Sequence, residues 1–164
     1  MSTAAATATQ AVSLAIGKNL TVGTAESLTA GMVAATLANT PGASGMLQGG
    51  VVAYQNSVKA SVLGVSESLL AASGSVDGGV AEAMADGARH ACGADVGVST
   101  TGVAGPEPHD GKAVGTVYIG IATQAGAESF EYSFSGDRQS IREQACEAAL
   151  ARLLAALSEV GYRS

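Results

Sequence analysis

Ser27 carries the clearest potential for chemistry in this sequence. It lies in the run Thr-Ala-Glu-Ser-Leu-Thr-Ala-Gly at positions 24–31, between a segment typical of a strand and an Ala-rich segment with helical spacing. A helix that begins here would direct free backbone N–H groups and the positive end of its dipole toward an anion or a developing oxyanion. Ser27 is therefore a candidate nucleophile. The alternative is a helix cap, because serine is preferred at that position for the same N–H groups.

A serine nucleophile needs a base, and the sequence offers Tyr54 and Lys59. They lie in the segment Tyr-Gln-Asn-Ser-Val-Lys, where a strand is expected to end and a helix to begin. Neither His90 nor His109 is well placed by motif, and the sequence has no Gly-x-Ser-x-Gly elbow. A lysine acts as a base only where burial or a cationic neighbour lowers its pKa. A solvated surface lysine is the alternative for Lys59.

Two further features could hold the rest of a substrate. The glycine-containing loop at 101–106 allows the backbone to approach a ligand closely, although it matches neither a Walker loop nor a dinucleotide fingerprint. Arg138 and Arg142 are four residues apart at the start of the last predicted helix, and therefore on one face of it. Cations at that end of a helix are unfavourable unless an anion or an acidic neighbour offsets them. An anion site and an ordinary charged surface remain the alternatives.

The composition argues against several classes of protein. The 164 residues carry a formal net charge of -6 and only 8 Lys and Arg residues, so we expect no nucleic-acid partner. No apolar run reaches the roughly 18 residues that cross a bilayer, and no secretory signal is visible, so we expect a cytoplasmic protein without membrane contact. Cys92, Cys146 and the two histidines show no metal-type spacing, and we expect neither a metal nor another cofactor.

The elements that position these residues are those of one domain over residues 1–164. Apolar periodicity and turn residues predict a three-layer α/β/α sandwich with a mixed, mostly parallel sheet. Strands are expected over 20–25, 49–54, 94–100, 114–123 and 128–134, and helices over 3–18, up to Asn39, over 57–63, from Ser66, from Asp77 and over 137–160. Ligands of such sheets bind beyond the carboxyl ends of strands. The segments 26–29 and 101–106 each follow a strand and are therefore expected to share one site.

Six motifs, in this order and spacing, resemble the CinA C-terminal family across nearly the whole chain. They are Ala-Glu-Ser-Leu-Thr-Ala-Gly at 25–31, Tyr-Gln-Asn-Ser-Val-Lys at 54–59, Leu-Gly-Val at 63–65, Thr-Gly-Val-Ala-Gly-Pro at 101–106, Val-Gly-Thr-Val at 114–117 and Gly-Asp-Arg at 136–138. The family usually has Cys and Gly where this chain has Leu28 and Ala30, and a glycine-rich stretch where this chain has Glu-Pro-His-Asp-Gly at 107–111. Many relatives carry a further N-terminal domain, so the resemblance implies the stand-alone form.

The family is similar to PncC-type nicotinamide-nucleotide amidases, which hydrolyse nicotinamide mononucleotide to nicotinate mononucleotide and ammonia without a metal. The resemblance implies that Ser27 is the nucleophile, that Lys59 and Tyr54 assist proton transfer, and that backbone N–H groups at the helix start stabilise the oxyanion. It also leads us to expect a homo-oligomer, a dimer or larger. We expect substrate contacts from Glu26, Thr29, Ser44, Asn56, Thr101, Gly102, Gly105, Arg138 and Arg142. Two alternatives stay open: a non-catalytic nucleotide- or protein-binding module linked to competence and DNA damage, and hydrolysis of another small amide.

Overall fold

The computed structural model describes residues 2–163, and its centre is a five-stranded sheet with the order β2-β1-β3-β4-β5. The strands are β1 (Val22–Glu26), β2 (Leu47–Val52), β3 (Val96–Gly102), β4 (Thr116–Thr123) and β5 (Gly126–Ser133). Both β2 and β3 pair in parallel with β1, whereas β4 pairs antiparallel with β3 and β5 pairs antiparallel with β4. Of these strands, β4 alone runs in the opposite direction. The predicted mixed, mostly parallel sheet with a terminal hairpin is confirmed.

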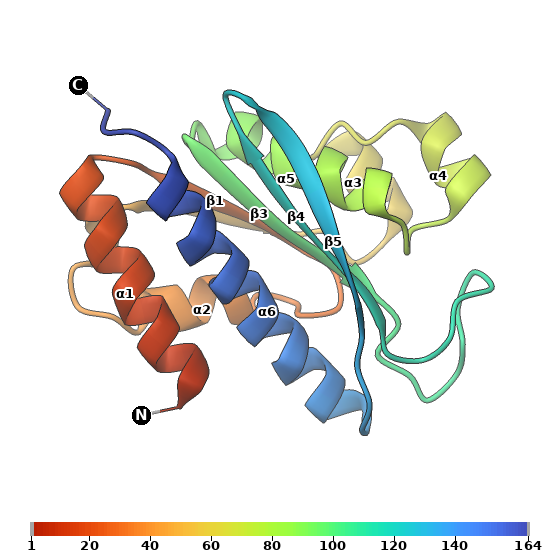
Figure 1. Ribbon diagram of the computed structural model, residues 1–164. Helices are drawn as coiled ribbons and strands as arrows, with labels where there is room; N and C mark the ends of the chain where they lie inside the picture. The colour runs from red at the N-terminus through yellow and green to blue at the C-terminus, as the bar shows by residue number, and fades with distance from the viewer. Residues whose placement is uncertain (1, 164) are drawn as a thin grey trace.

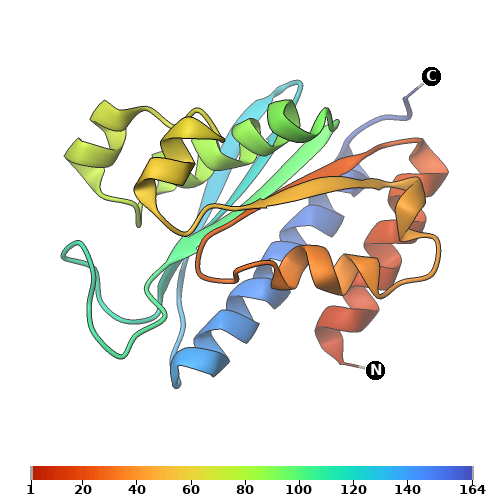
Figure 2. The same cartoon turned by 180° about the vertical axis from the view of Figure 1, so that it is seen from behind.

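Helices cover both faces of this sheet, as the predicted three layers require. One face carries α1 (Thr3–Lys18), α2 (Met32–Ala38) and α6 (Arg138–Glu159), and the other carries α3 (Asn56–Ser61), α4 (Glu67–Ser73) and α5 (Gly78–Cys92) (Figure 1). The view from behind shows the short α2 beside α1 and α6 (Figure 2). A single 3-10 turn, η1 (Ala43–Gly45), precedes β2.

Side-chain caps fix where several helices begin. Asp77 accepts the backbone N–H of Val80 at 3.1 Å and so starts α5, as its position in the sequence predicts. Asp137 does the same for α6 through the N–H of Ser140, at 2.9 Å. Such caps satisfy backbone donors that no turn of the helix can reach. The start of α6 matters for the site, because Arg138 is its first residue.

The sheet separates two hydrophobic clusters. The larger one lies against α1, α2 and α6, and its fully buried members include Val12, Leu37, Ile119, Leu150 and Leu153. The smaller one lies against α3, α4 and α5, and includes Ala53, Leu63, Val80 and Met84. No helix within residues 2–163 has the length and apolar character needed to cross a bilayer.

The parallel register brings several chain segments to one edge of the sheet. Glu26, the last residue of β1, pairs with Val52 of β2 and with Thr100 of β3. The residues that follow β1 and β2 therefore leave the sheet side by side, next to Thr101 and Gly102, the last residues of β3. Ser27 follows β1, and Tyr54 follows β2, which ends two residues earlier than the sequence pattern indicates.

Candidate active site

Ser27 and Lys59 meet at this carboxyl edge. The Lys59 ammonium nitrogen, Nζ, donates to Ser27 Oγ at 3.1 Å and to the backbone carbonyl of Tyr54 at 3.1 Å. Lys59 is only 1% exposed and Ser27 only 9%. The alternative of a solvated surface lysine does not hold, because the side chain is buried and its ammonium group points to Ser27 and to the Tyr54 carbonyl.

Burial also changes the protonation of Lys59. Desolvation lowers its pKa from 10.5 to about 8, against an opposing influence of the Asp110 carboxylate. A charged amine loses the stabilisation of bulk water when it is buried, so the neutral form gains. Near neutral pH a useful fraction of Lys59 is therefore unprotonated and able to accept the proton of a serine hydroxyl.

The turn that carries Ser27 is held by buried hydrogen bonds. The Ser27 N–H donates to the Thr100 carbonyl at 3.0 Å. The Glu26 carboxylate accepts the Thr29 hydroxyl at 2.7 Å, and Thr29 Oγ1 lies 2.7 Å from Thr100 Oγ1. Glu26 and Thr29 are 1% and 0% exposed. Neither residue lines the pocket, although substrate contact was expected of both; their side chains instead hold the turn behind Ser27.

The predicted oxyanion site at the helix start is also wrong. Helix α2 begins at Met32, five residues after Ser27, and its first N–H groups are already bonded. The Glu26 carboxylate accepts the N–H of Val33 at 2.8 Å and that of Ala34 at 3.1 Å. An internal carboxylate thus occupies the position at which we expected an anionic ligand.

A pocket of about 450 Å³ opens beside Ser27, beyond the carboxyl ends of the strands. Six of the predicted site residues besides Ser27 line it: Tyr54, Asn56, Thr101, Gly102, Gly105 and Arg138. The two loops expected to share a site, 26–29 and 101–106, both contribute to its wall. Over the part of the chain that the structure describes, no three His, Cys, Asp or Glu side chains gather in a way that could hold a metal ion.

Tyr54 and Arg138 form a second contact across this pocket. Arg138 Nη2 donates to the Tyr54 hydroxyl at 2.8 Å, and Nη1 donates to the Gly105 carbonyl. Tyr54 thus offers its carbonyl, not its phenol, to Lys59. The contacts give the phenol no part in the Ser27–Lys59 pair, because the guanidinium of Arg138 engages it.

Arg142 and Ser44 lie outside the pocket lining. Arg142 Nε donates to the carbonyl of Leu28 at 2.8 Å, so this cation holds the Ser27 turn from behind. Ser44 lies in η1, before the first residue of β2, whereas the pocket lies beyond the last. At about 3.3 Å of rise per strand residue, the length of β2 separates the two. The structure therefore does not bring Arg142 and Ser44 to the pocket lining with the other predicted residues.

Three residues that sequence reasoning missed contribute to the site. Ser75 and His109 line the pocket, and Asp110 bonds to Ser75. Ser75 follows α4 in a connection without any motif, so no local signal points to it. The Asp-Gly pair at 110–111 is a recognisable turn signal, but only the folded chain shows where that turn docks.

The structure is that of an α/β protein with a buried serine–lysine pair beside a pocket at the carboxyl edge of a mixed sheet, an arrangement typical of sites for nucleophilic chemistry. The chain belongs to the CinA C-terminal domain family, whose model matches residues 4–157.

Relatives with known names agree with this assignment. A CinA-like protein of Frankia casuarinae is 46% identical over 147 residues, which are 88% of this chain and 34% of that protein. A CinA-like protein of Anaeromyxobacter dehalogenans is 50% identical over 135 residues, which are 80% of this chain and 33% of that protein. The chain thus spans about a third of the length of these curated relatives.

Solved structures of the superfamily match over nearly their whole length. The CinA superfamily protein KP700603 from Klebsiella pneumoniae has a TM-score of 0.91 and 29% identity, covering 96% of this chain and 99% of that one. The competence/damage inducible protein CihA from Agrobacterium tumefaciens has a TM-score of 0.91 and 31% identity, covering 97% and 98%. The α/β fold is therefore shared with these proteins.

Proposed function

We propose that this protein is a metal-independent amidohydrolase that converts nicotinamide mononucleotide to nicotinate mononucleotide and ammonia. The observation that carries the proposal is the 3.1 Å contact between Lys59 Nζ and Ser27 Oγ, in a buried position that favours the neutral amine. A serine hydroxyl is a weak nucleophile unless an adjacent base removes its proton. The likeness to PncC-type amidases supplies the substrate.

In the first half of the proposed reaction, the neutral amine of Lys59 accepts the hydroxyl proton while Ser27 Oγ bonds to the carboxamide carbon. The electron pair of the C=O bond moves to oxygen. The intermediate then collapses, the C–N bond breaks, and Lys59 returns the proton to the leaving nitrogen, which departs as ammonia. The product of this half is an ester between Ser27 and the nicotinoyl group.

In the second half, water attacks the ester carbon and Lys59 accepts one of its protons. The bond to Ser27 Oγ breaks, Lys59 protonates that oxygen, and nicotinate mononucleotide leaves. Both intermediates carry an oxyanion, which needs preorganised donors. Because the helix N–H groups are occupied, we assign this task to backbone N–H groups at the pocket wall, where Leu28 and Ala104 are the candidates.

The pocket suits a mononucleotide in size and charge. Its volume of about 450 Å³ falls within the roughly 300–1,000 Å³ of small-ligand sites. Arg138 is the arginine among its lining residues, and a single guanidinium matches a single phosphate group. Part of its donor capacity is already used on Tyr54 and Gly105, which holds the remaining donors in one orientation.

The test is turnover of nicotinamide mononucleotide with a chelator present, measured as ammonia and nicotinate mononucleotide together. The unmodified protein should form both in equal amounts, and Ser27→Ala should lose at least about 10²-fold in rate. Ser44→Ala is the matched control, because Ser44 is an exposed serine outside the pocket.

Equal turnover by Ser27→Ala and the unmodified protein would exclude Ser27 as nucleophile. If calorimetry detects binding of the nucleotide but no product forms, the protein is a binding module instead. Release of ammonia only from other small amides would retain the serine mechanism and change the substrate.

A further inference from the structure

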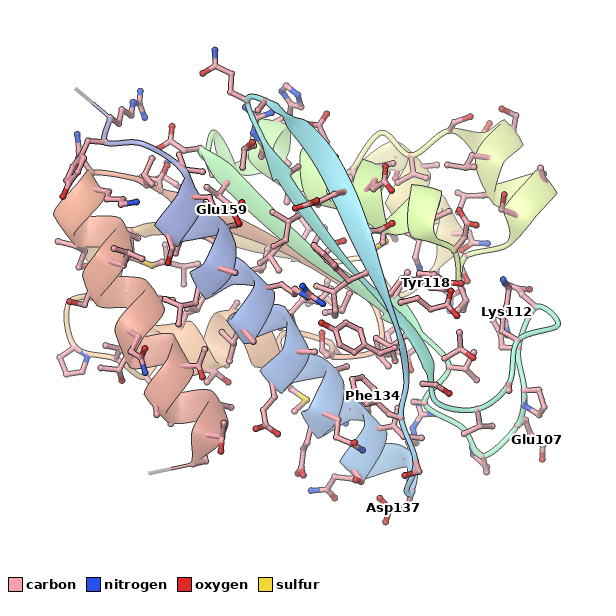
Figure 3. All side chains as sticks on the ribbon, viewed as in Figure 1. Glu107, Lys112, Tyr118, Phe134, Asp137 and Glu159 are labelled. Carbon is pink, nitrogen blue, oxygen red and sulfur yellow. The ribbon has the colours of Figure 1, made fainter. Side chains whose placement is uncertain are left out.

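The loop between β3 and β4 folds into a small hairpin with Asp110 and Gly111 at its tip. His109 and Lys112 exchange two backbone hydrogen bonds, of 3.2 and 2.9 Å. Asp110 and Gly111 both have positive φ angles, 51° and 72°, the signature of a type I′ turn, for which Asp-Gly is a preferred pair. The loop extends beyond the carboxyl edge of the sheet (Figure 1), with Lys112 on the side toward Tyr118 and Glu107 on the outer side (Figure 3).

The Asp110 side chain fastens this hairpin to the body of the protein. Asp110 Oδ2 accepts the Ser75 N–H at 3.0 Å and the Ser75 hydroxyl at 3.2 Å, and His109 Nε2 lies 3.3 Å from the same oxygen. Ser75 in turn accepts the Thr101 hydroxyl on its carbonyl at 2.7 Å. Ser75, Thr101 and His109 all line the pocket, so the hairpin, the α4–α5 connection and the end of β3 form one connected wall.

Asp110 also acts on Lys59 through its charge. It is the group whose negative charge raises the pKa of Lys59 against the larger effect of burial. The other titratable groups near the pair have their own partners: the Glu26 carboxylate accepts N–H groups of α2, the Tyr54 phenol accepts from Arg138, and His109 contacts Asp110 itself. Asp110 is thus the charged group whose removal should lower the pKa of Lys59 further.

We propose that Asp110 is a positioning residue for the Ser27–Lys59 site. Its carboxylate latches the hairpin onto Ser75, so that the hairpin forms a fixed wall of the substrate pocket. As a consequence of this placement, the Asp110 charge raises the pKa of Lys59 and so favours the ammonium form, which delivers the proton to the departing ammonia. The inference rests on the proposed amidase reaction, but both of its parts have readouts that need no turnover.

The first experiment compares Asp110→Asn and Asp110→Ala over a range of pH. The Asn side chain can still accept the Ser75 N–H but carries no charge, so the acidic limb of kcat/KM should move to lower pH by about half a unit, as expected for a partly exposed charge. The Ala variant should show the same shift and also a KM raised about threefold or more, because the latch is lost. Asp86→Asn removes a charge from the surface of α5, away from the pocket lining, and should change neither.

The second experiment measures the same two properties without substrate. Trace acylation of Lys59 by a small anhydride, followed by peptide mass spectrometry across pH, titrates the amine directly, and Asp110→Asn should shift that curve downward. Hydrogen exchange of residues 106–112 should be faster in Asp110→Ala than in the unmodified protein. Coincident titration curves would overturn the electrostatic part, and unchanged exchange would overturn the latch. If nicotinamide mononucleotide is not hydrolysed at all, these two readouts still decide the role of Asp110.

Discussion

Burying the Lys59 amine is unfavourable for stability. At the residue scale, this unfavourable free energy is the strongest argument that Lys59 has a chemical role. Its ammonium group is offered a hydroxyl and a carbonyl, Ser27 Oγ and Tyr54 O, and among residues 2–163 it has no carboxylate within salt-bridge distance. Burying an amine without a counter-charge costs stability. The two hydrogen bonds of Lys59 offset part of this cost, but they supply no counter-charge, and a lysine that acts as a base uses the neutral form that burial favours.

The activity should follow the titration of Lys59. The reaction needs the neutral amine, so kcat/KM should rise about tenfold per pH unit below the pKa of about 8 and level off above it. Initial rates measured from pH 6 to 9.5 in buffers of constant ionic strength check this. A rate that falls as pH rises from 7 to 8 would contradict a lysine base.

Replacing Lys59 by an apolar residue of similar length should abolish activity without weakening the fold. The folded pKa of Lys59 is lowered from 10.5 to about 8, so the unfolded chain binds more protons between these values and stability rises with pH across that window. Lys59→Met removes the free-energy cost of burying the protonated amine, which is present in full below pH 8. Its unfolding free energy relative to the unmodified protein should therefore be most favourable at pH 7 and should decline toward pH 10.5.

Urea unfolding at both pH values measures this difference, and Lys112→Met is the control for removing a lysine from the partly exposed hairpin. The burial argument is wrong if Lys59→Met is less stable than the unmodified protein at pH 7 and if this deficit is larger at pH 7 than at pH 10.5.

At the scale of elements, the connection from β1 to α2 is built around an internal carboxylate. Glu26 ends the strand and turns back to cap the helix through Val33 and Ala34, and it holds Thr29 as well. Arg142, from α6, binds the carbonyl of Leu28 on the same connection. Ser27 thus sits in a turn whose geometry is determined from both ends, which suits a nucleophile that must be held in place.

Glu26→Gln should therefore lower both stability and activity. The amide retains one acceptor oxygen but sets an NH₂ group against backbone donors, which should cost about 1–3 kcal/mol in the free energy of unfolding. Urea denaturation measures this value, and steady-state kinetics should show a reduced kcat because the Ser27 turn is displaced. Glu143→Gln, on the exposed side of α6, is the matched control. A Glu26→Gln variant as stable and active as that control would show that the cap is dispensable.

At the scale of the whole molecule, the site depends on how closely α5 approaches the sheet. A Cβ atom at Gly97 would overlap the Ala85 carbonyl, and one at Gly120 would overlap the Ala81 carbonyl. The helix therefore lies directly on glycine backbone of β3 and β4. Because β3 ends at the pocket, a displacement of α5 would be transmitted to Thr101 and Gly102.

Gly97→Ala should destabilise the protein, by about 1–3 kcal/mol as for other overpacked cores. Gly17→Ala is the opposite case, since nothing lies within 4 Å of the added methyl group in α1, and it should stabilise by roughly 0.5–1 kcal/mol. Thermal and urea unfolding of the two variants check the contrast. Equal effects of the two substitutions would mean that α5 does not rest on the glycines as described.

Local pattern was sufficient for the framework of this protein. The helix over 3–18, the cap at Asp77, the start of α6 at Asp137 and the terminal hairpin depend on neighbours close in sequence, and the structure has them. The mixed sheet and its three layers follow from the order of such elements. The motifs also directed attention to Ser27 and Lys59, although they left a helix cap and a surface lysine as open alternatives for these two residues.

The tertiary structure decided which groups the side chains contact, because these contacts are made with partners far away along the chain. Lys59 reaches a serine 32 residues earlier and Arg142 a carbonyl 114 residues earlier, and no local spacing encodes either contact. Burial lowers the pKa of Lys59 to about 8, and packing makes Glu26, Thr29 and Arg142 supports of the Ser27 turn. The sequence by itself determined which groups were present, while their charge state and their partners were set by folding.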